Sequence, residues 1–79
     1  GIVFQRDMLL DWRTVLDNVF LPLEFRRKPT KPYTEAALTL LETFGLRRSA
    51  NRYPWELSGG MRQRAAICRA LLDDPALLL

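Results

Sequence analysis

The chain has 79 residues, and its 12 Lys and Arg residues against 9 Asp and Glu residues give a formal net charge of +3. A chain of this length forms at most one small domain, its single cysteine excludes an internal disulfide framework, and it has no histidine, the commonest metal ligand. No apolar run approaches the roughly 18 residues that a membrane-spanning helix needs, and no signal peptide is visible. We therefore expect any contact with a membrane to be made through a partner.

The first part of the chain predicts a strand, an irregular segment and a helix. Residues 2–5 are typical of the end of a buried strand, and residues 6–13 show no regular period. Thr14 and Asp17 then have the spacing of a capping box, with Asp17 in place of the usual Glu. The apolar stripe that follows contains Val15, Leu16, Val19, Phe20 and Leu23. Pro22 supplies no N–H and clashes with the preceding turn, so we expect this helix to end or kink near Leu21.

A second helix is predicted after the proline-punctuated loop of residues 26–32. Its apolar face contains Tyr33, Ala37, Leu40, Leu41 and Phe44, at the spacing of an amphipathic helix. Gly45 is expected to end it, with Leu46 placed for the hydrophobic contact that accompanies such caps. We expect residues 47–56 to form a short helical turn and a loop that stops at Pro54.

The third predicted helix spans residues 59–72 and opens on two glycines. Met61, Ala65, Cys68 and Leu72 recur at helical spacing, and Ser58 is a good N-cap. A glycine inside a helix costs about 1 kcal/mol relative to alanine. Its bare backbone, however, lets an anion approach the free N–H groups at the positive end of the helix dipole. Ser-Gly-Gly is also an ordinary turn into a helix, so the tripeptide alone leaves both interpretations open.

The residues around the glycines carry a family resemblance. Residues 57–60 read Leu-Ser-Gly-Gly, and Gln63-Arg64, Ala65-Ala66-Ile67 and Arg69-Ala70-Leu71 follow. This pattern resembles the signature sequence of ABC transporter ATPases. The resemblance implies a mainly α fragment of an α/β P-loop NTPase domain, with cut strands at both ends. It implies a Q-loop region at 1–13, a helical subdomain at 14–57, the signature helix at 58–74 and the start of the Walker B strand at 75–79.

The resemblance also implies which residues form the site. Two ATPase domains of the family stack head to tail, so Ser58, Gly59 and Gly60 would contact the γ-phosphate of ATP held by the second ATPase subunit. Gln63 either approaches the ribose of that nucleotide or points to solvent. Gln5 corresponds to the Q-loop glutamine, whose amide reaches Mg²⁺ and the attacking water. Gln5 is therefore the expected catalytic and metal-contacting residue, with ATP and Mg²⁺ as cofactors.

The implied function is that of part of the ATP-hydrolysing subunit of an importer, which couples ATP binding and hydrolysis to uptake of a small solute. Met8, Leu9, Leu10 and Trp12, with the helix after them, would shape a groove for a coupling helix of the transmembrane permease subunit. A substrate-binding protein would be an indirect partner, and the subunit would lie peripherally on the cytoplasmic face of the membrane. Residues 9–19 and 21–24 resemble the nitrate, sulfonate, taurine and pyrimidine-precursor uptake group, although Asp11 stands where that group often has proline.

Several parts of the ATPase are not in these 79 residues. They contain no G-x-x-x-x-G-K-[ST] P-loop, no Walker B Asp-Glu and no switch histidine. Phosphoryl transfer depends on positioning and on charge stabilisation by such groups. We therefore expect the 79 residues alone not to hydrolyse ATP.

The remaining basic residues and the cysteine favour structural roles. Arg62 and Arg69 share a helical stripe and are expected to pair with acids, Cys68 is expected to be a small buried thiol, and residues 47–52 carry a solvated basic rim of Arg47, Arg48 and Arg52. An alternative function is a small helical nucleic-acid-binding module. It is disfavoured because Arg64 is rotated away from Arg62 and Arg69, whereas a helix that reads a groove aligns its basic side chains.

Overall fold

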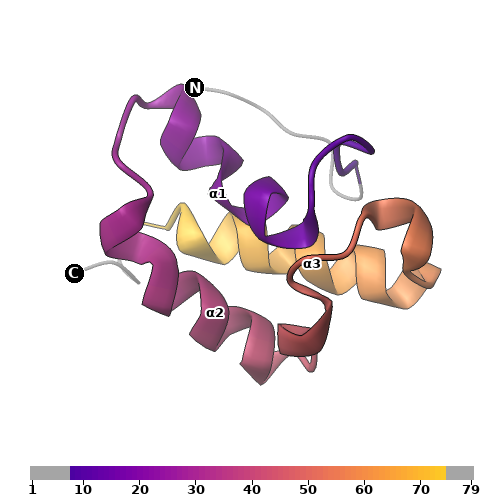
Figure 1. Cartoon of the computed structure of the whole chain (residues 1–79). Helices are drawn as coiled ribbons and strands as arrows, with labels where there is room; N and C mark the ends of the chain where they lie inside the picture. Colours follow the sequence, from indigo (N-terminus) through magenta and orange to yellow (C-terminus); the bar gives the residue numbers. More distant parts are fainter. Residues whose placement is uncertain (1–7, 75–79) are drawn as a thin grey trace.

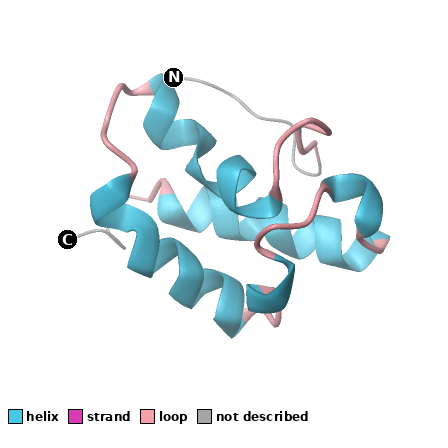
Figure 2. Ribbon diagram, in the orientation of Figure 1, coloured by secondary structure: helices cyan, strands magenta, loops and turns pink. Residues whose placement is uncertain are grey.

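The computed structural model describes residues 8–74 (Figure 1). Within that range the chain forms three α-helices, α1 (Val15–Phe25), α2 (Thr34–Thr43) and α3 (Gly59–Leu72), and no strand (Figure 2). Three short 3-10 turns, η1 (Lys31–Tyr33), η2 (Arg47–Ser49) and η3 (Pro54–Glu56), lie in the connections. The three predicted helices are confirmed. The strands expected at residues 2–5 and 75–79 lie outside the described residues.

Helix α3 is the central element, because both α1 and α2 pack against it (Figure 1). The buried side chains come from the apolar stripes of all three helices and from the connection between α2 and α3. They include Val15, Val19, Leu23, Ala37, Leu41, Leu46, Leu57, Ala65, Cys68 and Leu72. Within residues 8–74 no helix is both long and apolar enough to cross a membrane. The core residues do not include the first two residues of α3, so the start of this helix lies outside the core.

Helix α1 begins as the sequence predicts but ends later. The Thr14 hydroxyl accepts a hydrogen bond from the N–H of Asp17 at 3.2 Å, which satisfies one donor of the first turn. Of the two effects predicted for Pro22, an end near Leu21 is wrong, because α1 continues through Pro22 to Phe25, and a kink there stays a prediction. Pro22 is buried, and its carbonyl accepts from the N–H of Arg26 at 3.2 Å. The proline removes one hydrogen bond, while its ring is buried and the last turn closes beyond it.

Gly45 ends α2 as predicted, in the left-handed conformation with φ +75°. The N–H of Leu46 donates to the carbonyl of Leu41 at 2.7 Å, and the N–H of Gly45 donates to the carbonyl of Glu42 at 3.0 Å. These two bonds define a Schellman motif. Leu46 and Leu41 are both fully buried, which supplies the expected hydrophobic contact.

The end of α1 has the same motif with an arginine in the glycine position. The N–H of Lys28 donates to the carbonyl of Leu23 at 2.9 Å, and the N–H of Arg27 donates to the carbonyl of Glu24 at 3.0 Å. Arg27 has φ +57°, a conformation that costs a side-chain-bearing residue about 1 kcal/mol. A glycine would adopt it without that cost.

The connection between α2 and α3 contains the predicted short turn, but Pro54 starts a second turn rather than stopping the segment. Pro54 is the first residue of η3, where its missing N–H leaves no helical bond unmade. The Glu56 carboxylate accepts from the N–H of Tyr53 at 2.8 Å. This second turn leads directly into the N-cap of α3.

Candidate functional site

The start of α3 presents unpaired backbone donors. Ser58 is the N-cap, as predicted, and its hydroxyl oxygen accepts from the N–H of Met61 at 3.2 Å. Ser58, Gly59 and Gly60 are all exposed. Within residues 8–74 no hydrogen bond uses the N–H of Gly59 or Gly60. These two amides therefore lie free at the positive end of the helix dipole.

Nothing in the surrounding fold requires glycine at these two positions. Neither Gly59 nor Gly60 has a positive φ. A Cβ on Gly59 would approach only Nη2 of Arg62, at 4.0 Å, and one on Gly60 only Nη1 of Arg64, at 3.4 Å. Both neighbouring atoms are the ends of flexible side chains. Each glycine therefore forgoes about 1 kcal/mol of helix stability without relieving a steric conflict inside the described part of the chain.

The same distances show that two guanidinium groups flank the open glycines. Nη1 of Arg62 donates to the carbonyls of Leu57 at 3.0 Å and Pro54 at 3.4 Å, and Nε of Arg64 donates to the carbonyl of Phe44 at 3.2 Å. These bonds hold both side chains near the helix start. Two positive charges thus add to the dipole at the point where the amides are free.

The sequence analysis missed this contribution of the two arginines. It expected Arg62 to pair with an acid, whereas the Arg62 partners in the described residues are carbonyls of the turn before α3. The available signal was spacing, because Arg62 follows Gly59 by three residues and Arg64 follows Gly60 by four. Side chains at these spacings lie above one another on a helix face.

Of the other predicted site residues, Gln63 is exposed one helical turn beyond Gly59 and Gly60. It lies on the same face of α3 as these glycines, by helix geometry. Its two roles, toward a ribose or toward solvent, both stay predictions. Gln5 lies outside the described residues, so its role as a catalytic and metal-contacting residue also stays a prediction. Within residues 8–74 no group of three or more His, Cys, Asp or Glu side chains could hold a metal ion.

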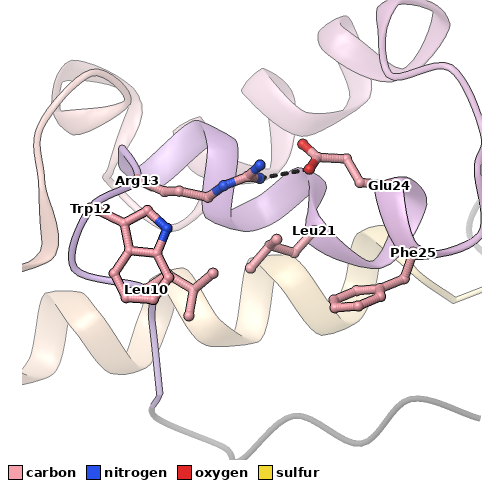
Figure 3. Close-up of a pocket in the computed structure, with 6 residues that line it drawn as sticks. All are labelled: Leu10, Trp12, Arg13, Leu21, Glu24 and Phe25. Atoms are coloured by element: carbon pink, nitrogen blue, oxygen red, sulfur yellow. Dashed lines mark ion pairs between the residues drawn. The ribbon is translucent and has the colours of Figure 1, made fainter.

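A groove of about 320 Å³ lies between the segment before α1 and the outer face of that helix (Figure 3). Its lining residues are Leu10, Trp12, Arg13, Leu21, Glu24 and Phe25. Trp12 is 74% exposed and Phe25 is 55% exposed, so the apolar walls are open. Arg13 and Glu24 form an ion pair of 2.7 Å across the groove (Figure 3). Of the residues predicted to shape a groove for a partner helix, Leu10 and Trp12 line this one, whereas Met8 does not and Leu9 packs against the core.

Asn18 fixes one wall of this groove, and the sequence analysis did not single it out. Its side chain is fully buried. Oδ1 accepts from the N–H of Leu10 at 2.7 Å, while Nδ2 contacts the carbonyls of Leu10, Arg13 and Thr14 at 3.1, 3.1 and 2.9 Å. The signal was a polar residue on the buried stripe of α1, between Val15 and Val19. Asn18 therefore ties the irregular segment to the helix.

Cys68 is buried, as predicted, whereas the partner shown for Arg69 is a backbone carbonyl and not the expected acid. Arg69 is 3% exposed, and its Nη1 donates to the carbonyl of Met8 at 2.7 Å; burial lowers the pKa of this guanidinium. The Cys68 thiol lies 3.6 Å from the carbonyl of Leu40, and burial raises its pKa to about 11. A thiol with a raised pKa is a poor nucleophile at neutral pH.

The basic side chains do not form a nucleic-acid-reading face. Arg69 is buried, and the side chains of Arg62 and Arg64 bind backbone carbonyls. Arg47, Arg48 and Arg52 are exposed, as expected of a solvated rim. No observation favours the nucleic-acid-binding alternative.

Comparison with known proteins adds a family. A family model described as ABC transporter matches residues 1–79. The chain is 49% identical over 79 residues to the taurine import ATP-binding protein TauB of Rhizobium johnstonii, which covers all of this chain and 30% of that protein. It is 52% identical to the methionine import ATP-binding protein MetN of Streptomyces coelicolor, over 100% of this chain and 22% of MetN. It is 48% identical to the formylaminopyrimidine import ATP-binding protein ThiZ of Halalkalibacterium halodurans, over 100% of this chain and 32% of ThiZ. The chain thus spans less than a third of the length of these relatives.

Proposed function

Because the chain belongs to the ABC transporter family, we propose that it is part of the ATP-hydrolysing subunit of an importer. This subunit couples ATP binding and hydrolysis to the uptake of a small solute across a membrane. The relatives are named for import of taurine, methionine and formylaminopyrimidine. These cargoes share little chemistry beyond small size, so the proposal extends to a small solute and not to one cargo.

The start of α3 is proposed to hold the terminal phosphate of ATP that is bound by a second ATPase subunit, stacked head to tail. The N–H groups of Gly59 and Gly60 would donate to phosphate oxygens. The Ser58 oxygen accepts from Met61, which leaves its O–H free to donate to the same phosphate. One observation carries this proposal: the fold has room for a side chain at both glycines, so their bare backbone is explained by a ligand that approaches it.

The donor set fits a phosphate group. Backbone amides, a hydroxyl and two nearby guanidinium groups supply donors and positive charge, which is what a phosphoryl group requires of its surroundings. ATP, when bound, supplies the phosphoryl group that is transferred to water. The residues of this chain would orient that group and balance its charge. A contact of Gln5 with Mg²⁺ and with the attacking water, and one of Gln63 with the ribose, are part of the same proposal.

The groove beside α1 is proposed to receive a coupling helix of the permease subunit. Its apolar walls, with Trp12 and Phe25 exposed, offer the surface on which an amphipathic helix docks. The Arg13–Glu24 pair supplies a polar rim. Attachment through this groove would hold the subunit peripherally on the cytoplasmic face of the membrane, and a substrate-binding protein would contact it only through the permease.

The test uses the full-length protein with Gly60→Ala. We expect the substitution to raise the stability of α3 by up to about 1 kcal/mol, because the new Cβ meets only the end of the Arg64 side chain. We also expect ATP-dependent dimerisation to weaken by about 10- to 100-fold, because the new Cβ would keep the phosphate from the Gly60 amide at the cost of about one charge-assisted hydrogen bond. Dimerisation is measured by light scattering with and without ATP, and ATP hydrolysis on the same samples.

The matched control is Ala70→Gly, at an exposed position of the same helix. It should lower helix stability by a similar amount and leave dimerisation unchanged. The opposite signs of the two effects separate ligand contact from folding. Wild-type dimerisation and hydrolysis by the Gly60→Ala protein would refute the proposed role of the glycines.

A further inference from the structure

A cluster of cations follows α1, in the loop that precedes α2. We call residues 26–31 the basic loop; its cations are Arg26, Arg27, Lys28 and Lys31, all exposed. No acidic residue occurs between residues 26 and 34. Arg26 pairs with Asp73 at the end of α3, at 3.2 Å. In the part of the chain that the structure describes, no ion pair involves Arg27, Lys28 or Lys31.

The backbone of the basic loop does not explain its charge. Arg27 occupies the left-handed position of the Schellman motif, with φ +57°, where glycine is the residue that fits best. An arginine here works against local folding, and its guanidinium makes no hydrogen bond among residues 8–74 that would offset the cost. The cation is therefore explained by something outside the fold, with opposite charge.

The surroundings of the basic loop indicate a membrane surface. Phe25 immediately precedes the loop and is 55% exposed, and it lines the same groove as Trp12, which is 74% exposed. This groove is proposed above to receive a helix of the permease, so the basic loop that follows Phe25 would lie beside the membrane subunit. Clustered cations near a membrane surface attract anionic headgroups.

We propose that the basic loop binds the headgroups of anionic phospholipids beside the permease. This rests on the proposed function in one respect, because it takes the groove that Phe25 lines to face the membrane subunit. The cations of the loop supply this contact themselves, and the permease strengthens it by holding the protein at the bilayer, which raises the local concentration of headgroups.

The test uses the full-length protein without its permease. Sedimentation with vesicles of phosphatidylcholine is compared with sedimentation with vesicles that contain roughly one third phosphatidylglycerol. The loop variant combines Arg27→Gly, Lys28→Gln and Lys31→Gln, and it spares Arg26 because of its pair with Asp73. Each cation near an anionic surface strengthens binding by roughly fivefold, so we expect the loop variant to bind anionic vesicles about 100-fold more weakly.

The matched control combines Arg47→Gln, Arg48→Gln and Arg52→Gln. These residues are also exposed, and the change in net charge is the same, so an effect of charge alone would appear equally in both variants. We expect the control variant to bind anionic vesicles less than about fivefold more weakly than the wild-type protein does. Binding of the wild-type protein to anionic vesicles should fall as salt is raised, and neutral vesicles should not bind it.

The proposal would be overturned if both variants lost binding to anionic vesicles equally, or if the loop variant lost none. Equal binding to neutral vesicles, or tighter binding to an acidic polypeptide or to DNA than to anionic vesicles, would also overturn it. ATP-dependent dimerisation is measured on the same samples and should match the wild-type value in both variants. Since dimerisation reports on the start of α3 and vesicle sedimentation on the basic loop, failure of the proposed function and failure of this inference give different results.

Discussion

Replacing Asn18 with alanine should release the segment that forms one wall of the groove. The Asn18 side chain is fully buried and makes one contact through Oδ1 and three through Nδ2. An amide nitrogen carries two hydrogens, so its three carbonyl contacts amount to two full hydrogen bonds. Three hydrogen bonds at about 1 kcal/mol each mean that Asn18→Ala should lower the stability of this segment by about 3 kcal/mol.

Asn18→Asp sharpens the test because its side chain has nearly the same shape. The acceptor for the Leu10 N–H remains, but a carboxylate oxygen now faces the carbonyls of Leu10, Arg13 and Thr14. A buried, unpaired charge costs more than a lost hydrogen bond. We therefore expect Asn18→Asp to be less stable than Asn18→Ala at neutral pH. Burial would raise the pKa of this carboxyl above its unfolded value, so the stability of Asn18→Asp should increase as the pH falls and a protonated carboxyl can donate.

The assay is hydrogen exchange at the Leu10 amide in the full-length protein, because Oδ1 of Asn18 accepts its hydrogen at 2.7 Å. A local loss of about 3 kcal/mol accelerates exchange roughly 100-fold. Asp17→Asn, at the exposed neighbouring position, is the control and should change exchange of this amide by less than about fivefold. Unchanged exchange in Asn18→Ala, or an Asn18→Asp protein as stable as Asn18→Ala at neutral pH, would refute the reasoning.

Three further outcomes follow from local geometry. Gly45→Ala should lower the free energy of unfolding by about 1 kcal/mol, because φ is +75°; an unchanged urea midpoint would contradict this. Arg27→Gly should raise it by about 0.5 kcal/mol, since glycine tolerates φ +57° but gains entropy on unfolding; a lower midpoint would count against the left-handed assignment. The pKa of Cys68 rises from 9.0 to about 11 in the folded chain. The unfolded chain therefore loses this proton first, so the free energy of unfolding should fall between pH 9.0 and about 11. Cys68→Ala should remove that slope in urea titrations.

The helices and two of their caps could be predicted from the sequence because their signals are local. The apolar stripes, the N-cap Ser58 and the terminating Gly45 each act within one or two turns. The continuation of α1 through Pro22 could not be predicted in this way, since burial of the ring offsets the missing hydrogen bond. Whether a helix continues through a proline depends on tertiary packing, which the local sequence pattern does not reveal.

In the candidate site, too, the features with local signals could be predicted and those that depend on tertiary contacts could not. The free amides of Gly59 and Gly60 follow from Ser-Gly-Gly at a helix start, whereas the approach of the Arg62 and Arg64 side chains depends on carbonyls supplied by Pro54, Leu57 and Phe44. Asn18 escaped notice for a similar reason. Its partners lie in an irregular segment, and no sequence period indicates where the carbonyls of such a segment point.

The hydrogen bond from Arg69 to the carbonyl of Met8 has a mechanical consequence. Arg69 lies ten residues after Gly59 on α3, or about 15 Å along the axis at 1.5 Å per residue. Helix α3 therefore binds the segment before α1 near its C-terminal end and carries the free amides at its N-terminal end. If a partner docks at the groove and the amides bind a neighbouring nucleotide, as proposed, a displacement of that segment which keeps the 2.7 Å bond intact would move α3 as well and so couple the two contacts.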